Sequence, residues 1–307
     1  MEYRVLGRTG LSVAVLAFGA GPVSGLMTGD DEDRQHEAVQ RAVQLGINWF
    51  DTAPGYGQGR SEQALGRCLR LVPERVHIAS KVRIQEDDFA DLPGAVRHSV
   101  EATLARLGRS SLTLLQLHNG ITPNRYDEPD SISPDDILRP NGVLGALRAL
   151  QRERLVHFIG LTGTGRPDAL RAVVRSGEFD TIQTPYNLLN PTAGRPEPPF
   201  EGDPDYGNII ADCHERQMGV FAIRVFAGGA LLGNPPSAHT LRTRYFPLAL
   251  YERDLVRTQK ILQDVGSRQG VKRQALRFVL SHPQIHAAII GFGAAADVDD
   301  TATMLEN

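Results

Sequence analysis

The segment Phe50-Asp51-Thr52-Ala53-Pro54-Gly55-Tyr56-Gly57 connects an apolar run to a loop rich in turn-forming residues. The run that leads into it, Ile47-Asn48-Trp49-Phe50, predicts a buried strand that ends at Asp51. A carboxylate at the end of a buried strand is unfavourable unless it has a partner, so we expect a cation close to Asp51. Tyr56 lies on the loop directly beyond the strand and should share one rim with this carboxylate.

Two further polar residues stand near the ends of the next two predicted strands. Residues 76–82 form an apolar run with Lys81 near its end, and residues 112–119 form another with His118 near its end. An acid, a phenol, a lysine and a histidine would thus arrive at the carboxyl ends of successive strands. In barrels of alternating strands and helices, this face carries the active site. We therefore predict four catalytic residues, namely Asp51, Tyr56, Lys81 and His118.

Strand-like and helix-like segments alternate along the rest of the chain. Two short strands between residues 3 and 13 predict an N-terminal hairpin. Eight further strands are predicted over residues 15–20, 47–53, 76–82, 112–119, 156–162, 181–187, 220–226 and 285–291. The main helices between and after them are predicted over residues 31–45, 61–71, 92–107, 142–154, 167–175, 208–217, 252–265 and 272–281.

Strict alternation of strands and helices predicts a parallel sheet, and eight such units favour a closed barrel. We therefore predict an α/β fold, a (β/α)8 TIM barrel with an N-terminal β-hairpin, formed by one domain over residues 1–307. The alternative is an open, doubly wound sheet. That fold is disfavoured because its Gly-x-Gly-x-x-Gly phosphate motif is missing between the first predicted strand and the first predicted helix.

The composition excludes several classes of protein. The 307 residues, 41% of them hydrophobic, suit a globular protein, and a net charge of -3 leaves no basic footprint for nucleic acid. The first residues lack the apolar stretch of a signal peptide, and no apolar run is long enough to cross a bilayer. Cys68 and Cys213 are too few and too isolated for a disulfide framework or a metal site. We therefore expect a cytoplasmic protein without metal, nucleic acid or membrane partners.

The four predicted catalytic residues suit the reduction of a carbonyl group and its reverse. A hydride moves between a cofactor and the carbonyl carbon, and the oxygen gains or loses a proton. Tyr56 could supply this proton if the cation of Lys81 activates it. Asp51 would fix the ammonium group, and His118 would bond to the carbonyl oxygen. Each residue alone also has a structural explanation, as a turn former, a packing side chain, a lysine that reaches solvent or a buried histidine.

The same motifs resemble those of the aldo-keto reductase family. Asp51-Thr52-Ala53-x-x-Tyr56-Gly57, followed by Ser61-Glu62, is similar to the family signature. Ala79-Ser80-Lys81 and Leu117-His118 are similar to later strands of the family, and the resemblance covers residues 6–291. It implies an (α/β)8 barrel, a nicotinamide cofactor, and a catalytic tetrad made of the four residues above with the tyrosine as general acid and base.

The resemblance also implies a cofactor site. Gln183, within Ile182-Gln183-x-x-Tyr186-Asn187, would hold the nicotinamide carboxamide. Thr162 and Gly163 replace the usual Ser-Asn pair of the family, so a hydroxyl is kept and an amide side chain is lost. The full set of predicted cofactor-binding residues is Ala20, Gly21, Asp51, Thr162, Gly163, Gln183, Arg224, Val225, Phe226, Gly229, Leu231, Gly291, Gly293 and Asp297.

Two segments depart from the family pattern. Ile223 or Arg224 takes the place of the aromatic residue that commonly stacks on the nicotinamide, although Arg224 could instead be a buried structural ion. Residues 228–233 are similar to the loop that closes over the pyrophosphate. Gly293 stands where the family supplies an arginine to the adenosine 2′-phosphate. Asp297, a helical turn beyond, could bond a ribose hydroxyl or simply cap the final helix.

The cofactor is therefore expected to be NAD(P)H, with NADP as the family habit and NAD favoured by the missing arginine. Loops on the rim should determine the substrate, which we expect to be a small carbonyl compound or a sugar. The variants at residues 160–163 and 228–231 resemble the sugar dehydrogenase branch. Candidate pocket walls are Tyr126, Phe200, Tyr206 and Phe246.

We predict an NAD(P)-dependent oxidoreductase that interconverts an aldehyde, ketone or sugar hemiacetal with its alcohol or lactone. The sequence leaves the physiological substrate, the direction of reaction and the oligomeric state open. Two alternatives from other classes remain. One is a reductase-like barrel that acts as a regulatory or ligand-sensing subunit. The other is a barrel hydrolase or lyase in which Lys81 forms a Schiff base with the substrate.

Overall fold

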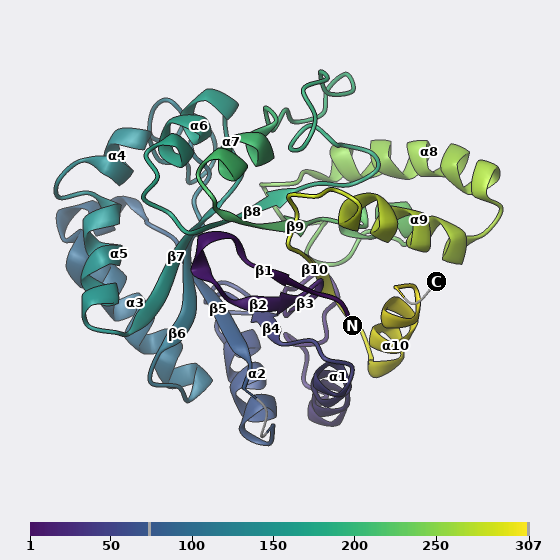
Figure 1. Ribbon diagram of the computed structural model, residues 1–307, viewed down its shortest axis with the longest axis horizontal. Coiled ribbons are helices and arrows are strands. Elements are labelled where there is room, and N and C mark those ends of the chain that lie inside the picture. Colours follow the sequence, from purple (N-terminus) through teal and green to yellow (C-terminus); the bar gives the residue numbers. More distant parts are fainter. Residues whose placement is uncertain (73–74, 306–307) are drawn as a thin grey trace.

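A barrel of parallel strands forms the centre of the molecule. The computed structural model describes residues 1–72 and 75–305, and within these ranges eight parallel strands close into a barrel (Figure 1). The strands are β3 (Leu16–Gly19), β4 (Trp49–Asp51), β5 (His77–Val82), β6 (Leu112–Leu117), β7 (Val156–Thr162), β8 (Thr181–Pro185), β9 (Gly219–Ile223) and β10 (Ala287–Gly291). Their order around the barrel follows the sequence, and β10 pairs with β3. The predicted (β/α)8 barrel is confirmed.

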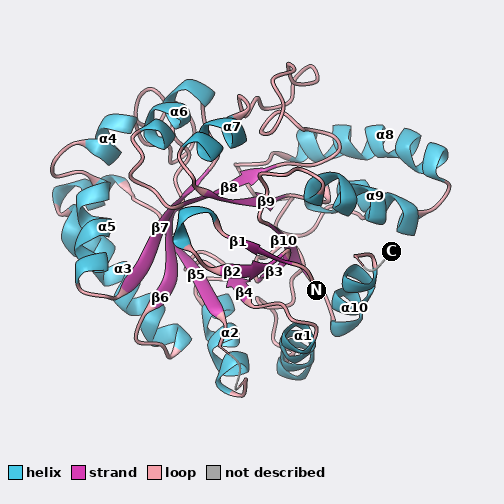
Figure 2. Ribbon diagram, in the orientation of Figure 1, coloured by secondary structure: helices cyan, strands magenta, loops and turns pink. Residues whose placement is uncertain are grey.

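Helices surround the barrel on all sides (Figure 2). They are α1 (Glu32–Gln44), α2 (Arg60–Arg70), α3 (Leu92–Leu107), α4 (Pro134–Leu138), α5 (Val143–Arg152), α6 (Pro167–Arg175), α7 (Ile209–Glu215), α8 (Leu248–Val265), α9 (Arg268–Leu280) and α10 (Ala295–Thr303). Short 3₁₀ helices also occur, namely η1 (Gly7–Thr9), η2 (Glu86–Ala90) and η3 (Ala227–Leu232). In the described part of the chain, every helix is too short or too polar to span a bilayer.

Local signals in the sequence explain where several helices begin and end. The Asp31 side chain accepts a hydrogen bond from the Arg34 amide and so caps the start of α1. Gly108 ends α3 in the left-handed conformation, with a φ of 62°, as its position after the last apolar residue predicted. α4 was not predicted from the sequence, although Ser133 and Asp136 form a capping box at its start.

The predicted strand over residues 220–226 was too long at its carboxyl end. β9 stops at Ile223, because Arg224 takes a φ of 55° and Ala227 a φ of 50°. Both values lie in the left-handed region, where a strand cannot continue. Val225 is nevertheless buried, so its apolar character serves loop packing rather than the sheet. The chain therefore leaves the barrel three residues earlier than the apolar run predicted.

The N-terminal hairpin closes one end of the barrel. Its strands, β1 (Tyr3–Val5) and β2 (Ser12–Ala14), pair antiparallel, and Figure 1 shows the hairpin lying across the ring of strands. Leu6 and Val13 belong to a buried cluster with the interior residues Trp49 and Phe221. The hairpin thus seals the end at which the strands begin, and only the end at which they finish is left for a site.

Candidate active site

The barrel interior changes from apolar to polar along the strands. Side chains two residues apart on a strand point to the same side of a sheet. The sealed end of the barrel holds an apolar layer that includes Trp49, Ala79 and Leu114. Two residues further along the same strands are Asp51, Lys81 and Gln116. All three of these polar side chains are buried, and they form the floor of the open end of the barrel.

Asp51 and Lys81 form a buried ion pair. The Lys81 Nζ lies 2.5 Å from Asp51 Oδ1 and also donates to the Thr52 carbonyl at 2.8 Å. Burial by itself would lower the pKa of Lys81, but interactions with Asp51 and Tyr56 together offset this effect, and the pKa is raised. Lys81 therefore carries a positive charge throughout the physiological range. The partner that the sequence analysis required for the acid is present.

Tyr56 lies on the loop above this ion pair. The Lys81 Nζ is 4.8 Å from the centre of the Tyr56 ring. The His118 ring meets the same phenol edge-on, with 6.0 Å between ring centres and 81° between ring planes. A Cβ at Gly21 would come within 3.7 Å of the Tyr56 ring, so the loop after β3 also reaches it. The structure thus brings together all four residues that were predicted to be catalytic.

His118 is uncharged at neutral pH. Burial lowers its pKa well below the ordinary histidine value, and the charges of Lys81 and Arg83 lower it further. Its backbone amide bonds to the Val82 carbonyl at 2.8 Å, which fixes the residue beside the end of β5. A neutral imidazole can donate a single hydrogen bond to a carbonyl oxygen without adding a second cation beside the lysine.

Two predicted cofactor-binding residues lie side by side at the ends of neighbouring strands. Thr162 of β7 pairs with Gln183 of β8 in the barrel register. Gln183 Nε2 donates to Asp51 Oδ2, which Gln116 Nε2 also contacts at 3.3 Å. The Thr162 hydroxyl is buried and has no hydrogen-bond partner among the described residues. An unsatisfied hydroxyl next to a primary amide suits a ligand that carries an amide of its own, such as the nicotinamide carboxamide.

Gly163 has a packing reason for lacking the amide side chain of the family pattern. A Cβ at this position would lie 2.9 Å from side-chain atoms of both Ile182 and Thr184. These neighbours are buried in the barrel wall, so a larger residue would require the wall to shift. The missing amide is thus a consequence of how β7 and β8 pack here.

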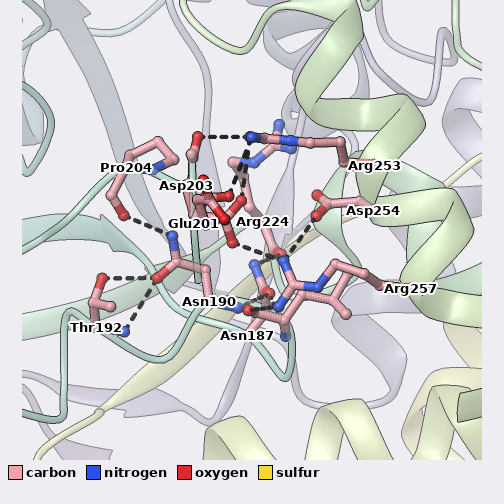
Figure 3. A network of polar contacts seen from close by, with 12 residues as sticks. Asn187, Asn190, Thr192, Glu201, Asp203, Pro204, Arg224, Arg253, Asp254 and Arg257 are labelled. Carbon is pink, nitrogen blue, oxygen red and sulfur yellow. Dashed lines mark hydrogen bonds and ion pairs between the residues drawn. The ribbon is translucent and has the colours of Figure 1, made fainter. Parts of the chain in front are cut away.

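The segment after β9 forms a tight turn rather than an aromatic surface on which a nicotinamide ring could stack. The Arg224 guanidinium lies over the Phe246 ring at 4.0 Å, and burial lowers the pKa of Arg224. Arg224 has no ion-pair partner in the described ranges, which distinguishes it from a paired structural ion. Figure 3 shows it inside a polar network with Asp203, Asp254 and neighbouring arginines.

The predicted cofactor-binding residues around this turn differ in which of their groups could contact a ligand. Val225 and Leu231 have buried side chains, so only their backbone groups are free for a ligand. Phe226 packs partly against the cluster that contains Leu231 and Tyr251. Gly229 takes a φ of 108°, which a residue with a side chain rarely adopts, and its place in the turn therefore depends on glycine.

At the opposite side of the rim, the first and last strands meet. The Ala20 amide bonds to the Asp51 carbonyl at 2.8 Å, which places the end of β3 beside the ion pair. A Cβ at Gly291 would lie 3.6 Å from the Ser24 side chain. The buried Ser24 hydroxyl has no hydrogen-bond partner in the described residues. Ser24 is a candidate ligand contact that the sequence analysis missed, because a lone serine in a loop carries no signal.

Asp297 caps the final helix. Its Oδ2 accepts hydrogen bonds from the Gly293 amide at 2.9 Å and from the Ala294 amide at 3.1 Å. The Arg34 guanidinium of α1 donates to the Gly293 carbonyl at 3.0 Å. Asp297 therefore makes the capping contacts, and a bond from it to a ribose hydroxyl stays a prediction. A cation also reaches residue 293 from a helix that is distant in the sequence.

The aromatic residues predicted to form the walls of the substrate pocket differ in how deeply they are buried. Tyr206 is buried in the main core, Phe200 is exposed with Arg257 over its ring at 4.4 Å, and Tyr126 is 43% exposed. The structure instead places Arg83, the first residue after β5, beside His118. Arg83 was missed because a single arginine in a polar loop gives no sequence signal.

Comparison with known proteins identifies the family of the chain. The model of the aldo/keto reductase family matches residues 15–307. D-threo-aldose 1-dehydrogenase of a Pseudomonas species is 27% identical over 325 aligned positions, which cover 95% of this chain and 89% of that protein. L-galactose dehydrogenase of Arabidopsis thaliana is 34% identical over 166 positions, 53% of this chain and 49% of that protein.

Solved structures share the fold. The holo form of aldo-keto reductase AKR11C1 from Bacillus halodurans superimposes with a TM-score of 0.71 at 21% identity, covering 100% of this chain and 91% of that chain. The family match spans nearly the whole sequence, and oxidoreductases recur among the relatives. The chain therefore belongs to the aldo/keto reductase family and is an NAD(P)-dependent oxidoreductase.

Proposed function

We propose that the protein reduces a carbonyl group, or oxidises the corresponding alcohol or hemiacetal, with Tyr56 as the general acid and base. The single observation that carries this proposal is the buried Asp51–Lys81 pair directly beneath the Tyr56 ring. When Tyr56 gives its proton to the developing alkoxide, the phenolate that remains lies beside a fixed positive charge. His118, neutral and edge-on to the phenol, donates a hydrogen bond to the same oxygen.

The bound nicotinamide nucleotide supplies or accepts the hydride. Gln183, which donates to Asp51 in the structure, and the unsatisfied Thr162 hydroxyl would hold its carboxamide. The remaining contacts come from Ala20, Gly21 and Gly291 on one side of the rim and from the Arg224–Leu231 turn on the other. We further propose that the whole chain acts as one domain, because both sides of this site are needed at once; residues 73–74 and 306–307 lie outside the described ranges.

The substrate class that we propose is a sugar or a related hydroxyaldehyde. Two relatives are dehydrogenases whose names specify an aldose and a galactose. The polar loops at the rim are consistent with a hydroxylated substrate. In the dehydrogenase direction, a cyclic hemiacetal would give a lactone through the same proton and hydride transfers.

The raised pKa of Lys81 argues against a Schiff-base mechanism. An amine must be neutral to attack a carbonyl carbon, and the ion pair with Asp51 keeps this one protonated. A purely regulatory barrel would bind the nucleotide without turning over a substrate.

The test is the change in nicotinamide absorbance when aldehydes and aldoses are added with either nucleotide. We expect turnover with at least one aldehyde. Nucleotide binding without turnover across the whole panel would support the regulatory alternative and contradict the proposed reaction.

A further inference from the structure

An arginine and an aspartate form a polar pair at the rim, next to the proposed active site. Arg83 Nη1 lies 3.3 Å from Asp130 Oδ2. The register pairs Val82 with Leu117, the last residues of β5 and β6, so Arg83 and His118, which directly follow them, are neighbours at the rim. Arg83 follows Lys81 by two positions, just beyond the end of β5, and its charge lowers the pKa of His118. The pair therefore adjoins the imidazole proposed to bond the carbonyl oxygen.

A buried asparagine holds the two halves of this pair in place. Asn119, only 1% exposed, accepts a hydrogen bond from the Ile84 amide at 2.9 Å and donates to the Ile84 carbonyl at 2.9 Å. The same amide group donates to the Asp130 carbonyl at 2.8 Å. Asp130 itself takes a φ of 55°, a conformation that costs energy unless its surroundings support it. The loops after β5 and β6 are thus fixed relative to each other around the pair.

The hydroxyl group of Tyr245 lies between Arg83 and Asp130. The Tyr245 phenol accepts a hydrogen bond from Arg83 Nη1 and donates one to Asp130 Oδ2. The Arg83 guanidinium also lies 4.4 Å from the centre of the Tyr245 ring. Tyr245 belongs to the segment between η3 and α8, and it is 39% exposed. A hydroxyl that both accepts and donates is therefore the group that this pair binds in the structure.

We propose that Arg83 and Asp130 bind a hydroxyl group of the substrate, and that this hydroxyl displaces the one of Tyr245. The inference rests on the proposed reaction and names its substrate class, which is hydroxylated aldehydes and aldoses rather than unsubstituted aldehydes. The guanidinium donates to the substrate oxygen, and the carboxylate accepts its proton in a hydrogen bond. A substrate carboxylate suits the pair less well, because Asp130 would repel it.

The experiment compares hydroxyaldehydes of three to five carbons with unsubstituted aldehydes of the same length, in the full-length protein with cofactor. The readout is the ratio of kcat/KM between the two members of each matched pair. Arg83→Met and Asp130→Asn should each lower this ratio about 10- to 100-fold, because each removes a charge-assisted hydrogen bond to the substrate. Arg97→Met, an exposed arginine on α3 that pairs with Glu153, is the matched control and should leave the ratio unchanged.

A ratio that stays constant in both variants would overturn the proposal. If the unmodified protein turned over no aldehyde at all, the proposed reaction would fail instead, so the two failures are distinguishable. Tyr245→Phe provides a second measurement, because it removes the competing hydroxyl and keeps the ring. It should lower KM for hydroxyaldehydes by about fivefold, the value of one ordinary hydrogen bond. A KM that is unchanged or higher would contradict displacement of Tyr245.

Discussion

Burial and neighbouring charge act in opposite directions on the pKa of Lys81. Removing a lysine from water favours its neutral form, yet the contact with Asp51 at 2.5 Å keeps it charged. The protein thereby holds a positive charge in a low-dielectric interior, where its effect on a neighbouring group is larger than in water. In the proposed reaction, this arrangement would supply electrostatic stabilisation without any movement of the charge.

The first prediction concerns the Tyr56 hydroxyl. Tyr56→Phe should keep the fold and the affinity for the nucleotide but reduce kcat by about two to four powers of ten, as is typical when a general acid or base is removed. Steady-state kinetics and a nucleotide titration measure the two effects separately. Tyr3→Phe, which removes a hydroxyl that bonds to the Gly46 carbonyl in the hairpin region, is the control and should not reduce kcat. Near-normal turnover in Tyr56→Phe would exclude the phenol from the mechanism.

The second prediction concerns coupling between Lys81 and Tyr56. Lys81→Met should reduce kcat about as much as Tyr56→Phe, and the double variant should be little worse than either, because groups that act as a unit are not additive. Lys81→Met also leaves the buried Asp51 without its cation, so Asp51→Asn/Lys81→Met is needed as a folded reference. Losses that multiply fully in the double variant would mean that the two residues act independently.

The third prediction concerns the nucleotide. We expect NAD to bind at least as tightly as NADP, because residue 293 has no side chain and the exposed Arg34 is already bonded to the Gly293 carbonyl. Gly293→Arg should shift the preference toward NADP by roughly 10- to 100-fold, the value of one charge-assisted contact. Fluorescence titrations with both nucleotides measure this shift. A strong NADP preference in the unmodified protein would contradict the argument, and its loss in Arg34→Ala would assign that preference to Arg34.

At the scale of elements, helix α8 anchors the loop that follows β8. Asp203 of this loop accepts hydrogen bonds from Arg253 at 3.2 Å and from Arg257 at 2.7 Å, both on α8 (Figure 3). Arg257 also donates to the Leu189 carbonyl at the start of the loop. The segment after β9 is attached to the same helix, because the Tyr251 hydroxyl of α8 donates to the Asn234 carbonyl at 2.9 Å.

The fourth prediction concerns Asp254, which lies within this anchor. Burial raises its pKa to about 6, more than the nearby Arg224 and Arg257 lower it. The folded state then binds more protons than the unfolded state between about pH 4 and pH 6. The contribution of Asp254 to stability is present below about pH 4 and is lost as the pH rises through about 6. The unmodified protein should therefore lose stability relative to Asp254→Asn as the pH rises from about 4 to about 6. Over this range the free energy of unfolding of the variant should gain ~1–3 kcal/mol on that of the unmodified protein.

Urea unfolding of both proteins at several pH values measures this difference. Asp264→Asn, a change at an exposed residue on the same helix, is the control. A stability difference that does not change with pH would mean that Asp254 is charged in the folded state throughout.

At the scale of the whole molecule, the periodic patterns predicted most of the architecture. Eight apolar runs alternating with amphipathic segments were sufficient for the barrel, and the motif around Asp51 located the ion pair and the phenol. The ends of strands were less predictable, because an apolar residue such as Val225 reads the same in a strand and in a buried turn. Such a turn depends on backbone angles that only tertiary contacts determine.

The residues that the sequence could not reveal share one property. Arg83, Asp130 and Tyr245 come from three loops, and their meeting depends on how those loops cross the rim. The contact of Arg34 with Gly293 likewise joins two ends of the chain that are adjacent only in the closed barrel. Contacts between distant loops leave no periodic pattern in the sequence. A single sequence therefore predicts the barrel and the residues of its motifs, but not which loops meet at the rim.

The hairpin that seals the barrel gives the molecule a built-in optical probe. Trp49 is the only tryptophan of the chain; it is fully buried, and its ring centre lies 4.7 Å from that of Phe221. An indole without contact to water emits at short wavelength and is inaccessible to dissolved quenchers. The adjacent His77, whose pKa is lowered by burial, stays neutral and does not quench the emission at neutral pH. A red shift of this emission will therefore report that the sealed end has opened, independently of events at the opposite rim.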